Sequence, residues 1–512
     1  MARFSAKDGF RNTILFGMTL LLMLTANFVT VLSGFFDEAA ANLMFAANIM
    51  LNLAIVCDLV PHIRRDFPFL IFVGTYNVLL LGRVYVSFLA HYSDLLFYLE
   101  AKDFYRLFIA LQVVTLSLLC IYAGYQMVGP FFAKREKMLR EKGWGAVSQS
   151  PLLPVIRQIS IIVLLVSSLA SFYVLLESIL KVLKSGYLGS FTQVSKDSVP
   201  SVISRLSMFF VPSFAVFLAT MPNRRQLRLP MTVYVVYLLA TLFTGRRNTF
   251  VCEALTILIY FVLRDTLKEE KKRIFKKKTV FSGIVLVVLV MYLLQRMAEI
   301  RAYGYLSRRN FMETVVNFLY SQGASFRVVI QTVNSRDLFN HSVTWKYLFY
   351  PFEMFIHNNL ITRSLFGLSP IIEVQTSAFV VSTHNYAHVL TYLVDPSRYL
   401  SGGGFGTSFV AEAYVAFGFL GVVLVSAGVG LVLRFFASML TRSWVILACC
   451  LIALRDFVYI PRSFAFLWVT NVFNLTYLCF YIAIYLAALF FVRVGAHVRP
   501  AGQTSKLGEE NP

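Results

Sequence analysis

Long apolar stretches separated by short polar connections dominate the pattern of this chain. Twelve of these stretches approach the about 20 residues that an α-helix needs to cross the hydrocarbon core of a membrane. They lie at residues 12–35, 43–62, 67–90, 104–128, 154–182, 201–221, 229–244, 248–264, 279–299, 407–433, 444–461 and 464–492. The pattern therefore predicts an all-α polytopic membrane protein with about twelve transmembrane helices.

The stretches are distributed unevenly along the chain. Residues 1–299 hold the predicted transmembrane helices 1–9, and residues 407–495 hold helices 10–12. Residues 300–406 form one long extracytoplasmic loop, and residues 496–512 form a short cytoplasmic tail. A loop of this length inside a compact protein is usually functional.

Two local patterns refine this layout. The stretches 229–244 and 248–264 are separated only by Gly245, Arg246 and Arg247, which predicts a tight helical hairpin. Within the long loop, residues 311–333 carry apolar side chains at helical spacing, and residues 345–356 are dense in aromatic side chains. Both segments are expected to be helices that lie in the outer interface of the membrane or dip into it.

The basic residues of the short connections indicate the orientation. Every second connection is rich in lysine and arginine, at residues 64–65, 134–142, 224–228, 264–278 and 434–442. The connections on the other face include the acidic residues 37–38 and the segment 94–103. Because lysine and arginine accumulate in cytoplasmic loops, both termini are predicted to be cytoplasmic.

Composition agrees with a membrane protein. Hydrophobic residues make up 58% of the chain and charged residues only 14%, which is well below the about 25% of soluble domains. The net charge of +21 reflects the basic connections, and no nucleic-acid partner is expected. All six cysteines fall in apolar stretches, so neither a disulfide framework nor a cysteine metal site is predicted. The first stretch lacks a cleavage site and is expected to remain as a helix.

The predicted outer face has an unusual cation composition. From Gly245 onward its basic residues are arginines, with Lys346 as the only lysine. Arginine is favoured over lysine where a planar guanidinium must bind a phosphate through two hydrogen bonds. A ligand role toward a diphosphate is predicted for Arg246, Arg301, Arg327 and Arg398. An anchoring role at helix ends is an equally good interpretation for Arg308, Arg309, Arg336 and Arg462.

A glycine-rich sequence, Ser-Gly-Gly-Gly-Phe-Gly-Thr-Ser, occupies residues 401–408 directly before a predicted helix. Glycines outside a helix N-terminus allow backbone amides to approach an anion, and the helix dipole adds to the attraction. Gly403 and Gly404 are therefore candidates for binding the same diphosphate. The alternative interpretation is a flexible turn without a ligand.

Two residues are candidates for a general base. Glu412 lies one turn into the helix after the glycines, and it is preferred narrowly over His384 because a helix fixes its position beside the cationic residues. The alternatives are a carboxylate that only complements the helix dipole and a histidine that is only solvated. His384 and His388 have no acidic or cysteine partner nearby in sequence, so no metal site is predicted. The loop also lacks an Asp-x-Asp motif and nucleotide-binding fingerprints, so no cofactor is expected.

Residues 244–248 (TGRRN), 321–327 (SQGASFR), 399–414 (YLSGGGFGTSFVAEAY) and 417–421 (FGFLG) resemble the Wzy-type polymerases of bacterial O-antigen and capsular polysaccharides. The resemblance is detailed over residues 244–434 and covers only the helix layout elsewhere. It implies a GT-C-like, metal-independent integral-membrane glycosyltransferase in the bacterial inner membrane.

The resemblance also implies the substrate and the partners. The substrate would be an oligosaccharide repeat unit on undecaprenyl diphosphate, polymerised at the outer leaflet, with membrane lipid, a chain-length regulator and a flippase as partners. Two other classes fit the residues themselves: a lipid-linked oligosaccharide flippase or other transporter, and an O-antigen ligase. Flippases tend to show two similar halves and charges in mid-membrane helices, whereas the charges here concentrate at the outer face.

Overall fold

The computed structural model describes residues 6–33, 38–93, 97, 100, 103–132, 151–192, 199–245, 247–267, 277–303, 307–339 and 342–498. All regular elements within these residues are helices, so the predicted all-α class is confirmed. Ten helical segments in the described part of the chain are long and apolar enough to cross a membrane. The basic connections 134–142 and most of 264–278 lie outside the described residues.

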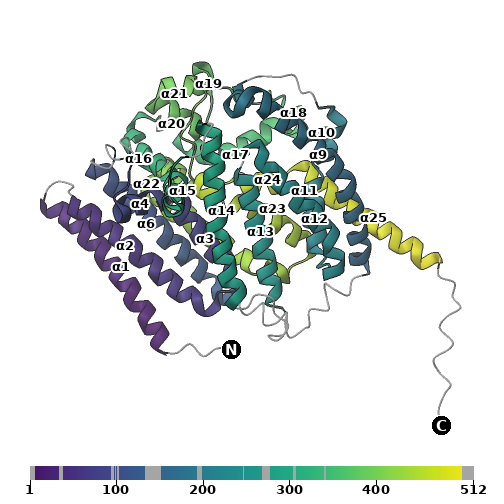
Figure 1. Ribbon diagram of the computed structural model, residues 1–512, viewed down its shortest axis with the longest axis horizontal. Helices are drawn as coiled ribbons and strands as arrows, with labels where there is room; N and C mark the ends of the chain where they lie inside the picture. Colours follow the sequence, from purple (N-terminus) through teal and green to yellow (C-terminus); the bar gives the residue numbers. More distant parts are fainter. Residues whose placement is uncertain are drawn as a thin grey trace, which may run out of the picture.

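The first part of the chain forms long helices, and α1 and α2 lie side by side at one edge of the molecule (Figure 1). The long and short helical elements of this part are α1 (Ala6–Ser33), α2 (Glu38–Leu59), α3 (Phe67–Tyr76), η2 (Asn77–Leu81), α4 (Gly82–Ala90), α6 (Phe104–Met127), α9 (Leu152–Thr192), α10 (Ser201–Ser207), α11 (Phe210–Ala219), α12 (Arg224–Thr241), α13 (Arg247–Asp265) and α14 (Lys277–Tyr303).

The second part begins with short helices and ends with long ones. The short helices are α15 (Phe311–Gln322), α16 (Ser325–Ser335), α17 (Thr344–Asn358), α18 (Leu360–Phe366), α19 (Ser377–Ser382), α20 (Tyr386–Val394) and α21 (Pro396–Leu400). They are followed by α22 (Phe409–Ala437), α23 (Trp444–Phe457), the 3₁₀ turn η7 (Ile460–Arg462), α24 (Leu467–Val472) and α25 (Leu475–Val498).

The predicted stretches coincide with these helices, but several stretches are interrupted. The stretch 201–221 is divided into α10 and α11, and 464–492 is divided into α24 and α25. The stretch 67–90 contains a π-helical turn, η2, between α3 and α4. Helices α13 and α14 are not among the ten apolar segments, and α13 carries four charged residues. These interruptions give polar side chains places to gather inside the apolar bundle.

Helices α6 and α22 approach each other closely through small residues. A Cβ atom on Gly430 would lie 2.0 Å from the carbonyl oxygen of Ile121, and one on Gly124 would lie 2.2 Å from that of Ala427. On the same two helices, the Ser117 and Ser426 hydroxyls lie 2.8 Å apart. Because lipid supplies no hydrophobic force between helices, such close backbone packing is what joins them. The contact fixes the helix that follows the glycine-rich segment.

A buried amide network joins α2, η2, α4 and α6. The Tyr85 hydroxyl lies 2.9 Å from Asn48 Oδ1 and 2.7 Å from Asn77 Oδ1. Asn77 donates to Asn52 at 2.7 Å, and Asn48 donates to Thr115 at 3.0 Å. Hydrogen bonding among these side chains offsets the cost of placing amides in an apolar interior.

The predicted helical hairpin between residues 229–244 and 248–264 is present. Helix α12 ends in a 3₁₀ turn, and Gly245 follows with φ 77°, a left-handed conformation that glycine adopts without steric cost. Helix α13 begins two residues later, at Arg247. The Arg247 guanidinium donates to the carbonyl of Leu294 at 2.9 Å and so attaches the hairpin to α14.

The short helices of the long loop cover one end of the molecule, with α19, α20 and α21 at the top of Figure 1. The predicted helices at residues 311–333 and 345–356 are present as α15, α16 and α17. The loop is attached to α14 at Glu299, whose buried carboxylate lies 3.0 Å from Arg296 and 3.3 Å from Arg309 and accepts a 2.8 Å hydrogen bond from Ser307. This end carries the candidate site.

Substituting Gly430 with alanine should destabilise the protein, because the added methyl group cannot fit against the α6 backbone. Overpacking of this kind costs about 1–3 kcal/mol or more. Thermal unfolding in detergent measures the effect. Gly428→Ala is the matched control on the same helix, since nothing lies within 4 Å of its Cβ position. Equal unfolding temperatures for the two variants would contradict the proposed α6–α22 packing.

Candidate functional site

The glycine-rich segment, residues 401–408, connects α21 to α22 and folds tightly against α21. Gly402 and Gly406 have φ values of 89° and 81°, which only glycine adopts readily. The Gly403 N–H donates to the Arg398 carbonyl at 2.9 Å, and a Cβ on Gly403 would lie 2.8 Å from Arg398 Cγ. A glycine at position 403 is therefore needed for the close approach of the Arg398 side chain.

Two of the predicted arginines meet at Phe405, inside the glycine-rich segment. The guanidinium carbon of Arg327 lies 5.0 Å from the centre of the Phe405 ring, and that of Arg398 lies 4.9 Å from it. The Phe405 N–H donates to the Thr391 hydroxyl at 3.1 Å, which fixes the backbone at Phe405 relative to α20. Contacts between a cation and a ring are favourable by about 0.5–2 kcal/mol each. The arrangement concentrates two positive charges on one short backbone segment.

The two arginines differ in their other partners. Arg327 Nε lies 2.7 Å from a carboxylate oxygen of Glu100, and Gln331 donates to that oxygen at 2.7 Å. Arg398 is exposed, and within the described residues no ion pair joins its guanidinium to a carboxylate. Arg327 is therefore held in place, whereas Arg398 faces solvent with its charge uncompensated by a direct contact.

Asp395 stabilises the start of α21. Its carboxylate accepts from the Arg398 N–H at 3.0 Å and from the Ser397 hydroxyl at 2.7 Å. The first of these contacts is the main cause that lowers the pKa of Asp395. The carboxylate is thus ionised at neutral pH and caps the short helix that carries Arg398.

A histidine–carboxylate pair lies in the same end of the molecule. His384 Nδ1 lies 2.8 Å from Glu353 Oε2, and the two side chains are 22% and 31% exposed. In a neutral ring whose Nδ1–H points to this carboxylate, Nε2 is an acceptor. This is the arrangement in which a histidine can take a proton from a substrate.

Residues 373–375 connect the His384–Glu353 pair to the glycine-rich segment that carries the arginine contacts. Glu373 accepts from Asn385, next to His384, at 2.6 Å, and Gln375 donates to the Gly403 carbonyl at 3.0 Å. Cα atoms two residues apart are separated by at most about 7 Å. The His384 pair and the glycine-rich segment are therefore neighbours on two sides of residues 373–375.

Glu412, the other candidate base, is fully buried. One carboxylate oxygen accepts from the Thr407 hydroxyl at 2.6 Å, and the other accepts from the Ala465 N–H at 3.0 Å. Contrary to the expectation that Glu412 lies beside the cationic residues, no salt bridge to it is found in the described part of the chain. The geometry makes Glu412 a link between the glycine-rich segment and the chain after η7.

The remaining predicted residues are placed as follows. Arg246 lies outside the described residues, and Arg301 lies on α14 with only its backbone described. Gly404 follows Gly403, and its Cβ position is 3.8 Å from the Thr391 hydroxyl. The structure thus brings together Arg327, Arg398, Gly403 and Gly404.

The arginines expected to anchor helix ends mostly contact protein. Arg309 pairs with Glu299, and the Arg336 guanidinium lies 5.1 Å from the Tyr414 ring centre. Arg462 donates to the Gln322 carbonyl at 3.4 Å, whereas Arg308 is exposed. Of these four, Arg308 is the one whose described surroundings best fit a solvated surface position.

Sequence reasoning missed Glu353, Phe405 and Glu100 as members of the site. Glu353 was detectable as a carboxylate within an aromatic interfacial helix, where an acidic side chain is costly without a partner. Glu100 pairs with a residue 227 positions away, and nothing local indicates such a pair.

The second histidine has a different environment. His388 Nδ1 lies 2.8 Å from the Tyr399 hydroxyl, and burial lowers the pKa of this imidazole. His388 is therefore neutral at pH 7 and supports the packing of α20 on α21. Within the described residues no group of three or more histidine, cysteine, aspartate or glutamate side chains is arranged to hold a metal ion.

A comparison with protein families finds a match over nearly the whole chain. Residues 13–494 match the family model described as O-antigen polysaccharide polymerase Wzy. No curated protein and no solved structure matches the chain.

Replacing Glu412 with alanine should lower the unfolding temperature in detergent, because the Ala465 N–H would lose its buried acceptor. Leaving such a group unsatisfied costs about 1–3 kcal/mol. Glu412→Gln is the matched control. The amide can keep both contacts, since its oxygen can accept from Ala465 while the Thr407 hydroxyl accepts from its NH₂ group. An unchanged unfolding temperature for Glu412→Ala would show that the buried link contributes nothing to stability.

Proposed function

The chain belongs to the O-antigen polysaccharide polymerase Wzy family, a family of multi-pass inner-membrane proteins, and we propose from this that its substrate is an oligosaccharide repeat unit on undecaprenyl diphosphate. It joins these units into O-antigen or capsular polysaccharide at the outer leaflet. The growing chain is transferred from its lipid diphosphate to the next lipid-linked unit. Family membership supports the polymerisation, and the geometry of the site supports the details that follow.

The pair of arginines around Phe405 is the observation that carries the proposal. A diphosphate leaving group develops negative charge as its bond to the sugar breaks, and preorganised cations lower the free energy of that transition state. Arg398 is exposed beside the glycine-rich segment, and Arg327 is fixed next to it by Glu100. Two guanidinium groups thus supply, without a metal ion, the positive charge that the leaving diphosphate needs.

The transfer step needs one further group. The acceptor hydroxyl attacks the anomeric carbon of the sugar on the diphosphate, the bond from this carbon to the phosphate oxygen breaks, and the lipid diphosphate leaves. The hydroxyl proton must pass to a base. His384 Nε2 suits this role because Glu353 holds the ring through Nδ1 and both side chains are reachable from outside.

Glu412 is assigned a positioning role. Its carboxylate is fully buried, and each oxygen already accepts a hydrogen bond, so a substrate hydroxyl has no path to it. It holds the last residues of the glycine-rich segment in place and thereby acts on the arginines indirectly.

Incubation of the purified protein with one synthetic lipid-linked repeat unit tests the function. A ladder of product lengths is the expected result. Transfer only to a different lipid acceptor would indicate a ligase, and the absence of any product with intact substrate would indicate a transporter. Either of these results would overturn the proposal.

Arg398→Lys should lower polymer formation about 100- to 1,000-fold, the usual effect of removing one preorganised donor from a developing anion. Lysine keeps the charge but loses the planar fork that binds a diphosphate through two hydrogen bonds. Initial rates of ladder formation measure the loss. Arg308→Lys is the control, because Arg308 is exposed outside the arginine pair, and it should behave as the wild type. Equal rates of ladder formation for Arg398→Lys and Arg308→Lys would show that the arginine pair does not act in the transfer step.

His384→Ala should lower the turnover number about 100- to 10,000-fold with little change in KM, because general-base catalysis contributes about this much. Glu353→Gln should lose less, since the amide oxygen still accepts from Nδ1 and only the charge is lost. Steady-state kinetics on lipid-linked substrate separates the two parameters. Normal turnover of His384→Ala, together with a stably folded but inactive Glu412→Gln, would indicate that Glu412 is the general base.

A further inference from the structure

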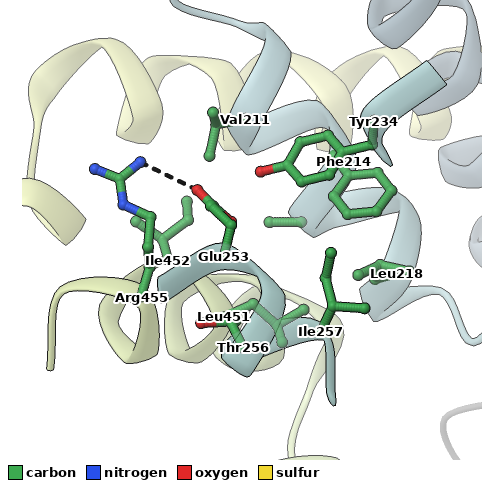
Figure 2. A pocket seen from close by; sticks show the side chains of 11 residues that line it. Val211, Phe214, Leu218, Tyr234, Glu253, Thr256, Ile257, Leu451, Ile452 and Arg455 are labelled. Atoms are coloured by element: carbon green, nitrogen blue, oxygen red, sulfur yellow. Dashed lines mark hydrogen bonds and ion pairs between the residues drawn. The ribbon is translucent and has the colours of Figure 1, made fainter. Parts of the chain in front are cut away.

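A second group of charged side chains lies between α13, α23 and α24, away from the arginine pair. Arg455 is placed between two carboxylates, with Nη1 3.3 Å from Glu253 and Nε 3.1 Å from Asp456. Figure 2 shows the pair of Arg455 and Glu253, with apolar side chains such as Val211 and Phe214 around it. Charged groups among apolar helices are costly and usually serve a function.

A polar cavity adjoins this group on the Asp456 side. Its volume is about 90 Å³, and its lining consists of Ile452, Arg455, Asp456, Asn471, Asn474 and Tyr477. All but Ile452 carry polar groups. One water molecule needs about 10–15 Å³ on this scale, so the cavity has room for a ring-sized polar group. Arg455, Asp456, Asn471, Asn474 and Tyr477 are each partly exposed, which makes the cavity reachable from outside.

The charges in the cavity favour a neutral ligand. One guanidinium stands against two carboxylates, so an anion such as a phosphate would meet no net attraction here. Asp456 is the single carboxylate in the lining, which is too few for a hard divalent cation. An alkyl chain would bury the polar groups without partners. A ligand with many hydroxyl groups satisfies all three conditions.

The hydrogen-bonding groups match such a ligand. Asn471 donates to Asp456 Oδ2 at 2.7 Å and so fixes the carboxylate, which retains further lone pairs. The Asn474 Oδ1 accepts from the Thr476 N–H at 2.9 Å at the start of α25, which fixes this amide as well. The Tyr477 ring offers a flat apolar face beside a hydroxyl. Sugars present this same combination of hydroxyl groups and apolar C–H faces.

The cavity is connected to the proposed catalytic groups through α24. Asn471 lies on α24, which packs against α17, the helix that carries Glu353. Phe466, just before α24, stacks on Phe349 of α17 with ring centres 5.5 Å apart. Ala465, one residue earlier, donates to Glu412. The cavity, the histidine pair and the glycine-rich segment therefore share one rigid support.

We propose that this cavity is a subsite for one sugar residue of the acceptor repeat unit, with Asp456, Asn474 and Tyr477 as specificity-determining residues. The assignment rests on the proposed polymerase function and adds to it a second, uncharged recognition site. Arg455, which also lines the cavity, positions Asp456 and is itself held by Glu253.

The probe for this site is the repeat-unit oligosaccharide released by mild acid from the lipid-linked intermediate of the same bacterium. Its dissociation constant is measured on the full-length protein in detergent by calorimetry, and KM and kcat are measured on the lipid-linked unit. Asp456→Asn and Tyr477→Phe should each weaken oligosaccharide binding and raise KM about 10-fold or more, because one hydrogen bond to the ligand is lost. The kcat values should stay within about twofold, since the reacting groups are untouched.

Asp337→Asn makes the same chemical change at an exposed carboxylate outside the cavity and should bind the oligosaccharide like the wild type. Tyr477→Phe keeps the Arg455–Asp456 pair intact, so this variant alone tests the subsite if Asp456→Asn disturbs folding. If the wild type forms a ladder and both Tyr477→Phe and Asp456→Asn bind the oligosaccharide with unchanged affinity, the subsite proposal is wrong and the polymerase proposal is retained. Oligosaccharide binding that both variants lose, in a protein that forms no ladder, would support the subsite and contradict the polymerase.

Discussion

The buried carboxylate of Glu412 is the contact on which the candidate site depends. It joins three parts of the chain: α22, the end of the glycine-rich segment at Thr407, and the link to α24 at Ala465. The carboxylate is fully buried, so breaking either hydrogen bond would leave a buried polar group unsatisfied at a cost of about 1–3 kcal/mol. The three parts therefore hold one geometry. The close packing of α6 on α22 extends this rigidity into the helical bundle.

The charged side chains of the two sites differ in their partners. Arg327 pairs with Glu100, which fixes its position, whereas the exposed Arg398 pairs with no carboxylate among the described residues. His384 Nδ1 contacts the Glu353 carboxylate, and Arg455 lies between the carboxylates of Glu253 and Asp456. We propose that the anion binds at Arg398, the exposed cation beside the glycine-rich segment.

Much of the fold was predictable, because a membrane allows few solutions. Backbone groups in hydrocarbon must be satisfied within a helix, so apolar stretches of sufficient length gave the helices, and helical spacing gave α15, α16 and α17. Asn474 caps the start of α25 locally through the Thr476 N–H, whereas the interruption at Asn77 depends on contacts with Asn52 and Tyr85 that no local pattern encodes. The same holds for the site. Residue types pointed to Arg327 and Arg398, but their meeting at Phe405 and the burial of Glu412 arise from contacts between distant segments.

We propose that arginines, without a metal ion, hold the diphosphate of the lipid carrier. The most direct test is the dissociation constant of sugar-free undecaprenyl diphosphate for the full-length protein in a metal chelator, compared between the wild type and Arg398→Ala. We expect the wild type to bind equally well with and without the chelator, and Arg398→Ala to bind at least about 10-fold more weakly, since one charge-assisted contact is lost. Binding that disappears with the chelator, or that is unchanged in Arg398→Ala, would show that the arginines do not hold the diphosphate in this way.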